Sequence, residues 1–147
     1  MQYSNGTVET THTINEFIAQ KNQDEISFRN FSTFDLINGT EYLIKNVIDD
    51  YMDELLSICI DVDLTRDQYV RYKYSPDLLA YDIYGYIQLD YLIMQINGVI
   101  EPRDFNFKKL KLPYASQLSS FLNSVYNSET IYIEYNRNLM EANQTVL

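Results

Sequence analysis

The residue types that most often carry chemistry at neutral pH are scarce in this chain. Among 147 residues there is one histidine, His12, and one cysteine, Cys59. Acid–base catalysis usually recruits a histidine, but His12 lies in a polar N-terminal stretch outside any predicted core. Cys59 lies in an apolar run, where a buried and inert thiol is expected. We therefore predict no Cys–His nucleophile pair.

Carboxylates are plentiful and offer a second route to chemistry. Asp61 and Asp63 would share one face of a strand, at a spacing that suits a metal ion or a glycosidase-like acid pair. A calcium loop would also need a glycine and a terminal glutamate, which are missing here. Solvated surfaces explain this pair and a second acidic group at a predicted helix end, so we predict no catalytic residue, metal site or cofactor, and no enzyme. The second group comprises Asp49, Asp50, Asp53 and Glu54.

The chain is acidic and rich in tyrosine. Its net charge is −10, from 21 acidic and 11 basic residues, so phosphate backbones and anionic membrane surfaces repel it. With 46% hydrophobic residues and 14 tyrosines it can bury a core and still present half-polar aromatic surface. No run of apolar residues approaches the ~18 that a membrane span needs. No secretion signal is visible. The expected location is a reducing cytoplasm, or a particle assembled there.

In the first half of the chain, local patterns predict alternating helices and strands. A capping-box pair at Thr13 and Glu16 predicts a helix over 14–21, and Asn38-Gly39 predicts a turn. Helical spacing of apolar residues over 43–56 predicts a longer helix that ends near residue 53 or 54. Alternation over 56–64 then predicts a half-buried strand.

The central stretch, residues 72–99, has the clearest start and stop residues. A second capping box, Thr65 with Gln68, predicts a helical turn before an extended segment at 72–74. Ser75 and Pro76 predict the start of a helix that ends at Gly85. A second helix is predicted over 89–96 and ends at Asn97-Gly98. A short strand is predicted around residues 110–112. Beyond it, the spacing predicts a helix over 118–125, a strand over 131–135 and an unpatterned arm from 136 to 147.

The order extended segment, helix, helix, strand resembles a LysM-like module. More narrowly, the sequence SPDLLAYDIYG at 75–85 resembles the version found in baseplate wedge proteins of contractile-tailed bacteriophages. The shared features are Tyr72 and Tyr74, a Pro-Asp-x-Leu-Ala-Tyr-x-x-Tyr-Gly core over 76–85, an apolar helix and the Asn-Gly stop. The resemblance covers roughly a third of the chain.

This resemblance implies a small LysM-like β-α-α-β core. Together with the local patterns, it gives an expected α+β fold with additional N- and C-terminal helices and extended arms. The implied regions are 1–64, a module over 65–113, and 114–147. The implied function is a structural adaptor of the virion tail baseplate, made in the host cytoplasm. It would be present in multiple copies, joining neighbouring wedge proteins and binding neither nucleic acid nor membrane.

Two alternatives stay open at this point. Secreted LysM domains bind cell-wall glycans, but Tyr86-Ile87 stands where those proteins carry small, threonine-rich residues, which favours a protein-facing surface. An acidic protein that mimics DNA is a third possibility. For the adaptor, the predicted interface residues are tyrosines outside the Leu/Ile face together with apolar residues of the C-terminal tail: Tyr81, Tyr84, Tyr86, Ile87, Tyr91, Ile131, Ile133 and Tyr135.

Overall fold

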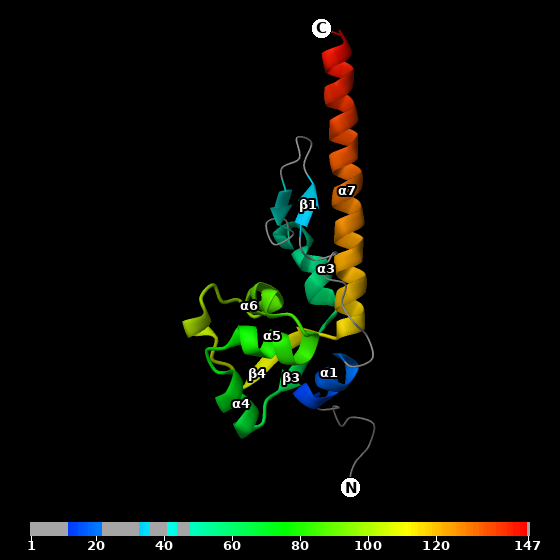
Figure 1. Cartoon of the computed structure of the whole chain (residues 1–147). Coiled ribbons are helices and arrows are strands. Elements are labelled where there is room, and N and C mark those ends of the chain that lie inside the picture. The colour runs from blue at the N-terminus through cyan, green and yellow to red at the C-terminus, as the bar shows by residue number, and fades with distance from the viewer. Residues whose placement is uncertain (1–11, 22–32, 36–40, 44–47, 147) are drawn as a thin grey trace.

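The computed structural model describes residues 12–21, 33–35, 41–43 and 48–146 (Figure 1). Helices and strands are mixed in an α+β arrangement. A body of short elements lies at one end of a long C-terminal helix. In chain order the elements are α1 (Ile14–Lys21), β1 (Thr33–Asp35), β2 (Glu41–Leu43), η2 (Ile48–Tyr51), α3 (Met52–Ser57), β3 (Cys59–Asp63), α4 (Arg66–Tyr72), α5 (Pro76–Tyr84), η3 (Ile87–Leu89), α6 (Asp90–Ile96), η4 (Pro102–Asp104), β4 (Lys109–Pro113) and α7 (Ala115–Val146).

Two antiparallel strand pairs are present among the described residues. β1 pairs with β2, and β3 pairs with β4 in a register that sets Ile60 opposite Leu112 and Val62 opposite Leu110. Val62, Leu110 and Leu112 are buried, because alternate residues of a strand point to the same face. Helices α5 and α6 lie between β3 and β4 in the sequence, and they pack on each other while α6 packs on β4.

One hydrophobic core contains residues of α1, η2, α3, β3, α4, α5, η3, α6, β4 and α7. It begins with Ile14 and Phe17 of α1, includes the inner faces of α5 and α6, and ends with the first turns of α7. The core therefore draws residues from all three predicted regions of the chain. The described residues that are most completely buried include Phe17, Phe105, Ile14, Ile48, Leu55, Leu79, Ile83, Leu89, Leu92, Ile93 and Leu110.

The predicted start positions of α1, α4 and α5 are confirmed, although the Ser75 side chain makes no capping hydrogen bond at the start of α5. At α4, the Gln68 N–H donates to Thr65 Oγ1 at 3.2 Å and the Thr65 N–H donates to Gln68 Oε1 at 3.0 Å. This is the reciprocal capping box. Helix α5 begins at Pro76 and ends at Gly85, whose φ of 86° is the left-handed conformation that glycine adopts readily. Helix α1 spans the predicted 14–21.

The predicted helix over 43–54 is wrong at its start. Residues 41–43 form β2, residues 44–47 lie outside the described ones, and the chain is helical from Ile48 to Ser57. The strand that follows is accordingly shorter than 56–64 and begins at Cys59. Pairing of β2 with β1 competes with the helical spacing, and the predicted Asn38-Gly39 turn lies between these strands, outside the described residues.

The predicted strand over 131–135 and the unpatterned arm after it are also wrong. A single helix, α7, runs from Ala115 to Val146. The apolar residues in this part of the chain satisfy both a strand and a helical spacing, and no glycine or proline interrupts residues 115–146. With the helix already nucleated on the core, its extension costs little. Within the described part of the chain, no helix combines the length and apolar character that crossing a membrane requires.

The segment predicted to be extended at 72–74 instead forms a tight connection. Tyr72 is the last residue of α4, and Tyr74 has a φ of 62°. This left-handed conformation is unusual for a residue with a side chain. The Tyr74 N–H donates to the Phe105 carbonyl at 2.7 Å, and this bond holds the turn that leads into α5.

Candidate interaction surface

Two of the predicted interface residues are well exposed on the body of the protein. Tyr81, on α5, is 55% exposed, and Ile87, at the start of η3, is 53% exposed. Their elements pack against each other, so both side chains belong to the surface of the same pair of elements. Large apolar side chains that are exposed on the surface of a small protein are often used in protein–protein contacts.

Tyr84 is a structural residue, and its prediction as an interface residue is wrong. Its side chain is only 3% exposed, and its hydroxyl donates to the Pro113 carbonyl at 2.6 Å. Burial raises the pKa of this hydroxyl well above its usual value. The bond ties the last turn of α5 to the end of β4. Tyr84 follows Ala80 by four positions, so it continues the buried face of the helix.

Tyr86 and Tyr91 are intermediate cases. Both are half-buried and pack against the hydrophobic core. The Tyr91 hydroxyl is buried without a hydrogen-bond partner among the residues that the structure describes, and burial raises its pKa. Both residues therefore use part of their surface to close the core, which leaves less for a partner than Tyr81 offers.

The predicted interface residues of the C-terminal tail also differ in how the structure describes them. Ile131 and Tyr135 are exposed on α7, whereas the Ile133 side chain lies outside the described ones. Two neighbours that the sequence interpretation missed, Tyr132 and Leu139, are exposed as well. Helical spacing would have found them. The predicted strand over 131–135 hides Tyr132, and the predicted unpatterned arm from 136 hides Leu139.

Other exposed apolar residues also escaped the sequence interpretation. Val70 on α4, Tyr74 in the turn after it, and Ile100 before η4 are half to almost fully exposed. Ile100 is 90% exposed, the largest value among these side chains. No periodic pattern marks them, because isolated apolar residues in short helices and turns leave no repeat to detect.

His12 is not the exposed spectator that its polar neighbourhood predicts. Its ring Nδ1 lies 3.2 Å from Glu16 Oε2 and 3.1 Å from the Tyr114 hydroxyl, which itself donates to Glu16 at 3.0 Å. The His12 carbonyl accepts from the Asp63 N–H at 3.1 Å. These contacts tie the start of α1 to β3 and to the start of α7, which gives His12 a structural role.

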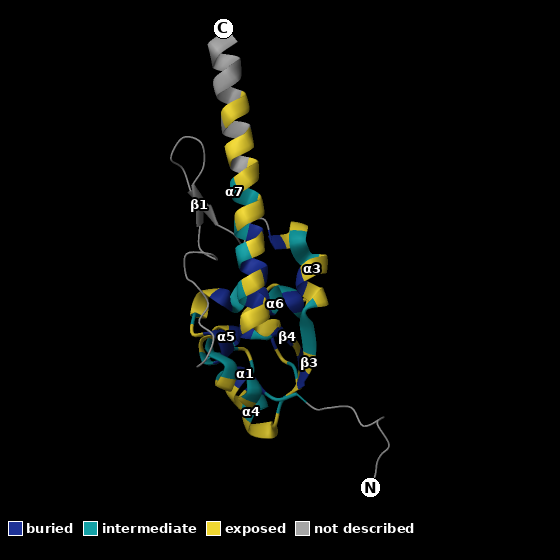
Figure 2. Cartoon of the chain, turned by 90° about the vertical axis from the view of Figure 1, so that its right-hand side faces the viewer, coloured by how far each residue is buried: buried dark blue, intermediate teal, exposed yellow. Residues whose placement is uncertain are grey.

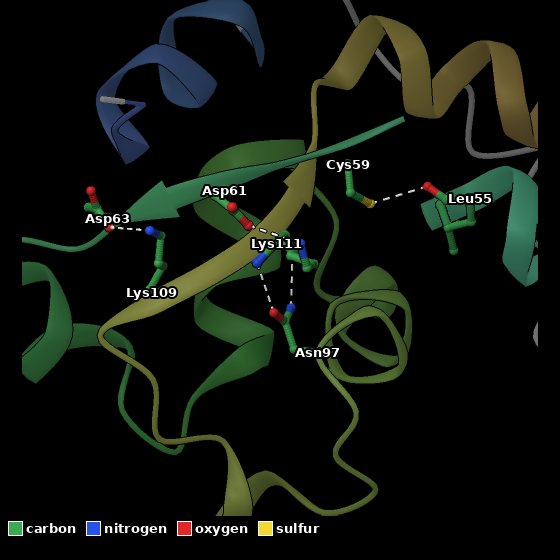
Figure 3. A network of polar contacts seen from close by, with 7 residues as sticks. All are labelled: Leu55, Cys59, Asp61, Asp63, Asn97, Lys109 and Lys111. Carbon is green, nitrogen blue, oxygen red and sulfur yellow. Dashed lines mark hydrogen bonds and ion pairs between the residues drawn. The ribbon is translucent and has the colours of Figure 1, made fainter. Parts of the chain in front are cut away.

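The strand carboxylates are paired with lysines rather than with each other. Figure 3 shows Asp61 facing Lys111 and Asp63 facing Lys109 across the β3–β4 ladder, with N–O distances of 3.0 Å and 3.9 Å. The hydrogen bond from Lys111 lowers the pKa of Asp61 below its ordinary value. Each carboxylate is thus neutralised locally, as cross-strand pairs commonly are. The acidic residues at 49, 50, 53 and 54 are all exposed.

The same view shows how α6 is fastened to the sheet (Figure 3). Asn97 Oδ1 accepts from the Lys111 N–H at 2.8 Å, while its Nδ2 donates to the carbonyls of Lys111 and Ile93. One side-chain amide therefore occupies both backbone groups of a strand residue, as a neighbouring strand would. Nearby, Cys59 Sγ donates to the Leu55 carbonyl at 3.2 Å, and burial raises the thiol pKa to about 11.

A charged cluster joins α4 to α5. The Arg71 guanidinium contacts Asp82 Oδ2 at 3.0 Å, and the Tyr72 hydroxyl donates to the same oxygen at 2.7 Å. Burial, and then the bond to Asp82, raises the pKa of Tyr72 to about 12. The cluster orders the turn at Lys73 and Tyr74 between the two helices.

Comparisons of the chain with protein-family models, curated proteins and solved structures return no match. Within the described ranges, no group of three or more His, Cys, Asp or Glu side chains is placed to hold a metal ion. Exposed apolar side chains lie on α5 and η3 and on α7, and also at Val70, Tyr74 and Ile100.

Proposed function

We propose that this chain is a non-enzymatic structural component of a bacteriophage tail baseplate, located in the virion. In this role it is an adaptor that joins neighbouring wedge proteins, with several copies in one symmetric assembly. The carrying observation is the antiparallel pairing of β3 with β4, two strands that flank α4, α5 and α6 in the sequence. The resemblance to the LysM-like module of wedge proteins implies two strands around two helices, but it places the first strand at 72–74, whereas β3 precedes the predicted module and α4 follows β3.

The roles of the residues in the resembling segment support the same proposal. Pro76 stands at the start of α5, Leu79 and Ala80 are buried, and Gly85 makes the left-handed cap. The requirements of folding explain the residue type at each of these positions. Tyr81 is different, because more than half of its side chain is in water and no packing need accounts for it.

The proposed contact surface is therefore Tyr81 with Ile87. An exposed aromatic ring and an exposed branched aliphatic side chain on two packed elements suit the buried centre of a protein interface. Tyr86-Ile87 also takes the place of the small residues that the glycan-binding relatives of the module use. Bulky apolar side chains at that place suit a protein partner better than a sugar.

Incorporation into particles tests the proposal. A phage that encodes Tyr81→Ala with Ile87→Ser should assemble particles with at least about tenfold less of this chain, since losing two central anchors costs about 2–4 kcal/mol of binding. Quantitative mass spectrometry of purified particles gives the readout. The matched control is Val70→Ser, which removes an equally exposed apolar side chain from α4 and should leave incorporation unchanged.

Two results would contradict the proposal. One is the absence of the wild-type chain from purified particles. The other is retention of the purified chain on insoluble peptidoglycan, which would favour the glycan-binding alternative.

A further inference from the structure

The distal half of α7 carries an apolar stripe that lies open to solvent. It consists of Ile131, Tyr132, Tyr135 and Leu139, which are 67%, 63%, 64% and 49% exposed. We call these four residues the α7 stripe. Figure 2 shows this part of the helix as mostly exposed, beyond the level at which the core covers it. A patch of two tyrosines and two aliphatic residues is large for a surface helix.

The spacing of the stripe is that of a helix-pairing seam. At about 100° per residue, its four positions fall within an arc of about 100°. Leu118, Val125, Tyr132 and Leu139 recur at intervals of seven residues, the repeat by which helices pack along one another. The first two are buried by the protein's own core, and the last two are not. The same spacing continues in the sequence to Val146.

Charge is absent from the stripe itself, and Glu129 and Glu134 lie beside it, three positions from Tyr132 and Ile131. Ser128 and Asn138, which flank it at helical spacing, are uncharged. In the stretch from 127 to 146 the charged residues all occupy helical positions outside the stripe: Glu129, Glu134, Arg137 and Glu141. A chain with a net charge of −10 repels its own copies, so an uncharged strip is where two copies can approach most closely.

The helix that carries the stripe is already ordered. Its first turns are held in the core by Leu118, Leu122 and Val125, and the Tyr51 hydroxyl donates to Glu129 at 2.7 Å just below the stripe. The β1–β2 pair lies beside α7 in Figure 1, yet the stripe remains exposed. Because the helix is already folded, binding of a partner does not have to order it, and this lowers the free-energy cost of association.

We propose that the α7 stripe binds the α7 stripe of a second copy of this chain. A suitable partner is a helix with an apolar seam of the same length and with no charge within it, and α7 itself has both properties. Self-pairing of one patch is the isologous contact of two-fold symmetric dimers. This inference does not rest on the proposed function, because the contact needs only the chain itself.

The test measures the association of the purified full-length chain. Sedimentation velocity from about 1 to about 200 µM should show a reversible dimer, at the weak end expected for a small interface. Tyr132→Glu and Leu139→Glu should each weaken it at least about tenfold, because a carboxylate would be buried against its own copy. Ser120→Glu adds the same charge at an exposed position of α7 before the stripe and should leave association unchanged. Circular dichroism confirms that each variant keeps its helix.

Cross-linking supplies an independent readout. In a Cys59→Ser background, Tyr135→Cys should give covalent dimers with a short bismaleimide, whereas Glu134→Cys, exposed but outside the stripe, should not. A wild-type chain that stays monomeric at the highest concentration overturns the proposal and leaves the stripe for a different protein. Association that Tyr132→Glu and Leu139→Glu leave intact also overturns it.

Discussion

Single side chains in this protein replace contacts that backbone pairing would otherwise supply. Asn97 is the clearest case, because its amide satisfies both the N–H and the carbonyl of Lys111 and also caps α6 through the Ile93 carbonyl. Sequence reasoning placed Asn97 correctly at a helix end. It did not predict the contact with β4, because that contact depends on how the helix is set against a strand far along the chain.

Replacement of Asn97 should therefore be costly. Asn97→Ala removes three hydrogen bonds and leaves backbone groups of Lys111 and Ile93 without that partner, so we expect the free energy of unfolding to fall by about 1–3 kcal/mol. Urea denaturation followed by circular dichroism measures the change. Asn127→Ala, at an exposed position of α7, should stay within about 0.5 kcal/mol of wild type. Equal effects of the two substitutions would refute the role given to Asn97.

The thiol of Cys59 should be protected from modification. Its pKa of about 11, against an ordinary 9.0, leaves about 100-fold less thiolate at pH 8. Iodoacetamide should therefore alkylate the folded protein at least about 100-fold more slowly than the urea-unfolded protein, with a rate that rises as pH approaches 11. Mass spectrometry of timed samples gives the rates, and comparable rates in the two states would contradict the burial of the thiol.

At the scale of elements, α7 combines two different roles within one helix. Its first turns complete the core with Leu118, Leu122 and Val125, whereas the turns that carry the α7 stripe extend past it into solvent. Helical continuity couples these two halves. Any partner that holds the distal half thereby holds the body of the protein.

A matched pair of substitutions separates the two halves. Leu122→Ala creates a cavity in the core and should lower the free energy of unfolding by about 2–5 kcal/mol. Leu139→Ala, at micromolar concentration where the chain is monomeric, should change it by less than about 0.5 kcal/mol. Chemical denaturation of both variants checks the contrast, and a large loss for Leu139→Ala would show that the distal half packs on the body.

Sequence patterns predicted helices well where nearby capping residues, a proline or a glycine specify the helix ends. The capping pairs at Thr13 and Thr65 located α1 and α4, and Pro76 with Gly85 set both ends of α5. Errors arose where two periods fit the same residues. Alternation over 131–135 also fits a helix, and spacing over 43–56 also fits a strand that turns into a helix. Pairing of β2 with β1 decided the second case, and extension of a helix nucleated on the core decided the first; one sequence alone shows neither.

The candidate surface was only partly predictable for a related reason. Tyr81 and Ile87 differ from Tyr84 by their position around α5 and η3, and small rotations of a short helix decide which tyrosine enters the core. Tyr84 fits the inner face because its hydroxyl reaches the Pro113 carbonyl, a partner from the far end of β4. No local sequence pattern predicts a hydrogen-bond partner so far along the chain.

Considered as a whole, the molecule keeps its tyrosine hydroxyls neutral in and around one core. Burial raises the pKa of Tyr72 to about 12, and raises those of Tyr84 and Tyr91 as well. The unfolded chain loses these protons near the ordinary pKa of 10.0, whereas the folded chain keeps them to higher pH. The folded state therefore binds more protons than the unfolded state throughout that interval.

This difference in the number of bound protons determines whether the free energy of unfolding rises or falls with pH. The stabilisation is complete below pH 10, and it is lost as pH rises from 10 towards 12. Urea midpoints measured at several values in this interval should fall steadily. Tyr72→Phe should make the fall less steep, because one ionisable group is gone. A midpoint that does not change with pH would contradict the burial of these hydroxyls.

The β3–β4 ladder also fixes the order in which the chain can fold. Asp61 and Lys111 are 50 residues apart, so β3 leaves the ribosome long before its partner strand exists. Until β4 emerges, α5 and α6 have no sheet to cover, and the buried face of Val62 remains open. The earliest turns of α7 then close the core, because Leu118 and Leu122 are part of it. This core can thus close only after the first turns of α7 have been synthesised, and nascent chains stopped before Ala115 lack the residues that close it.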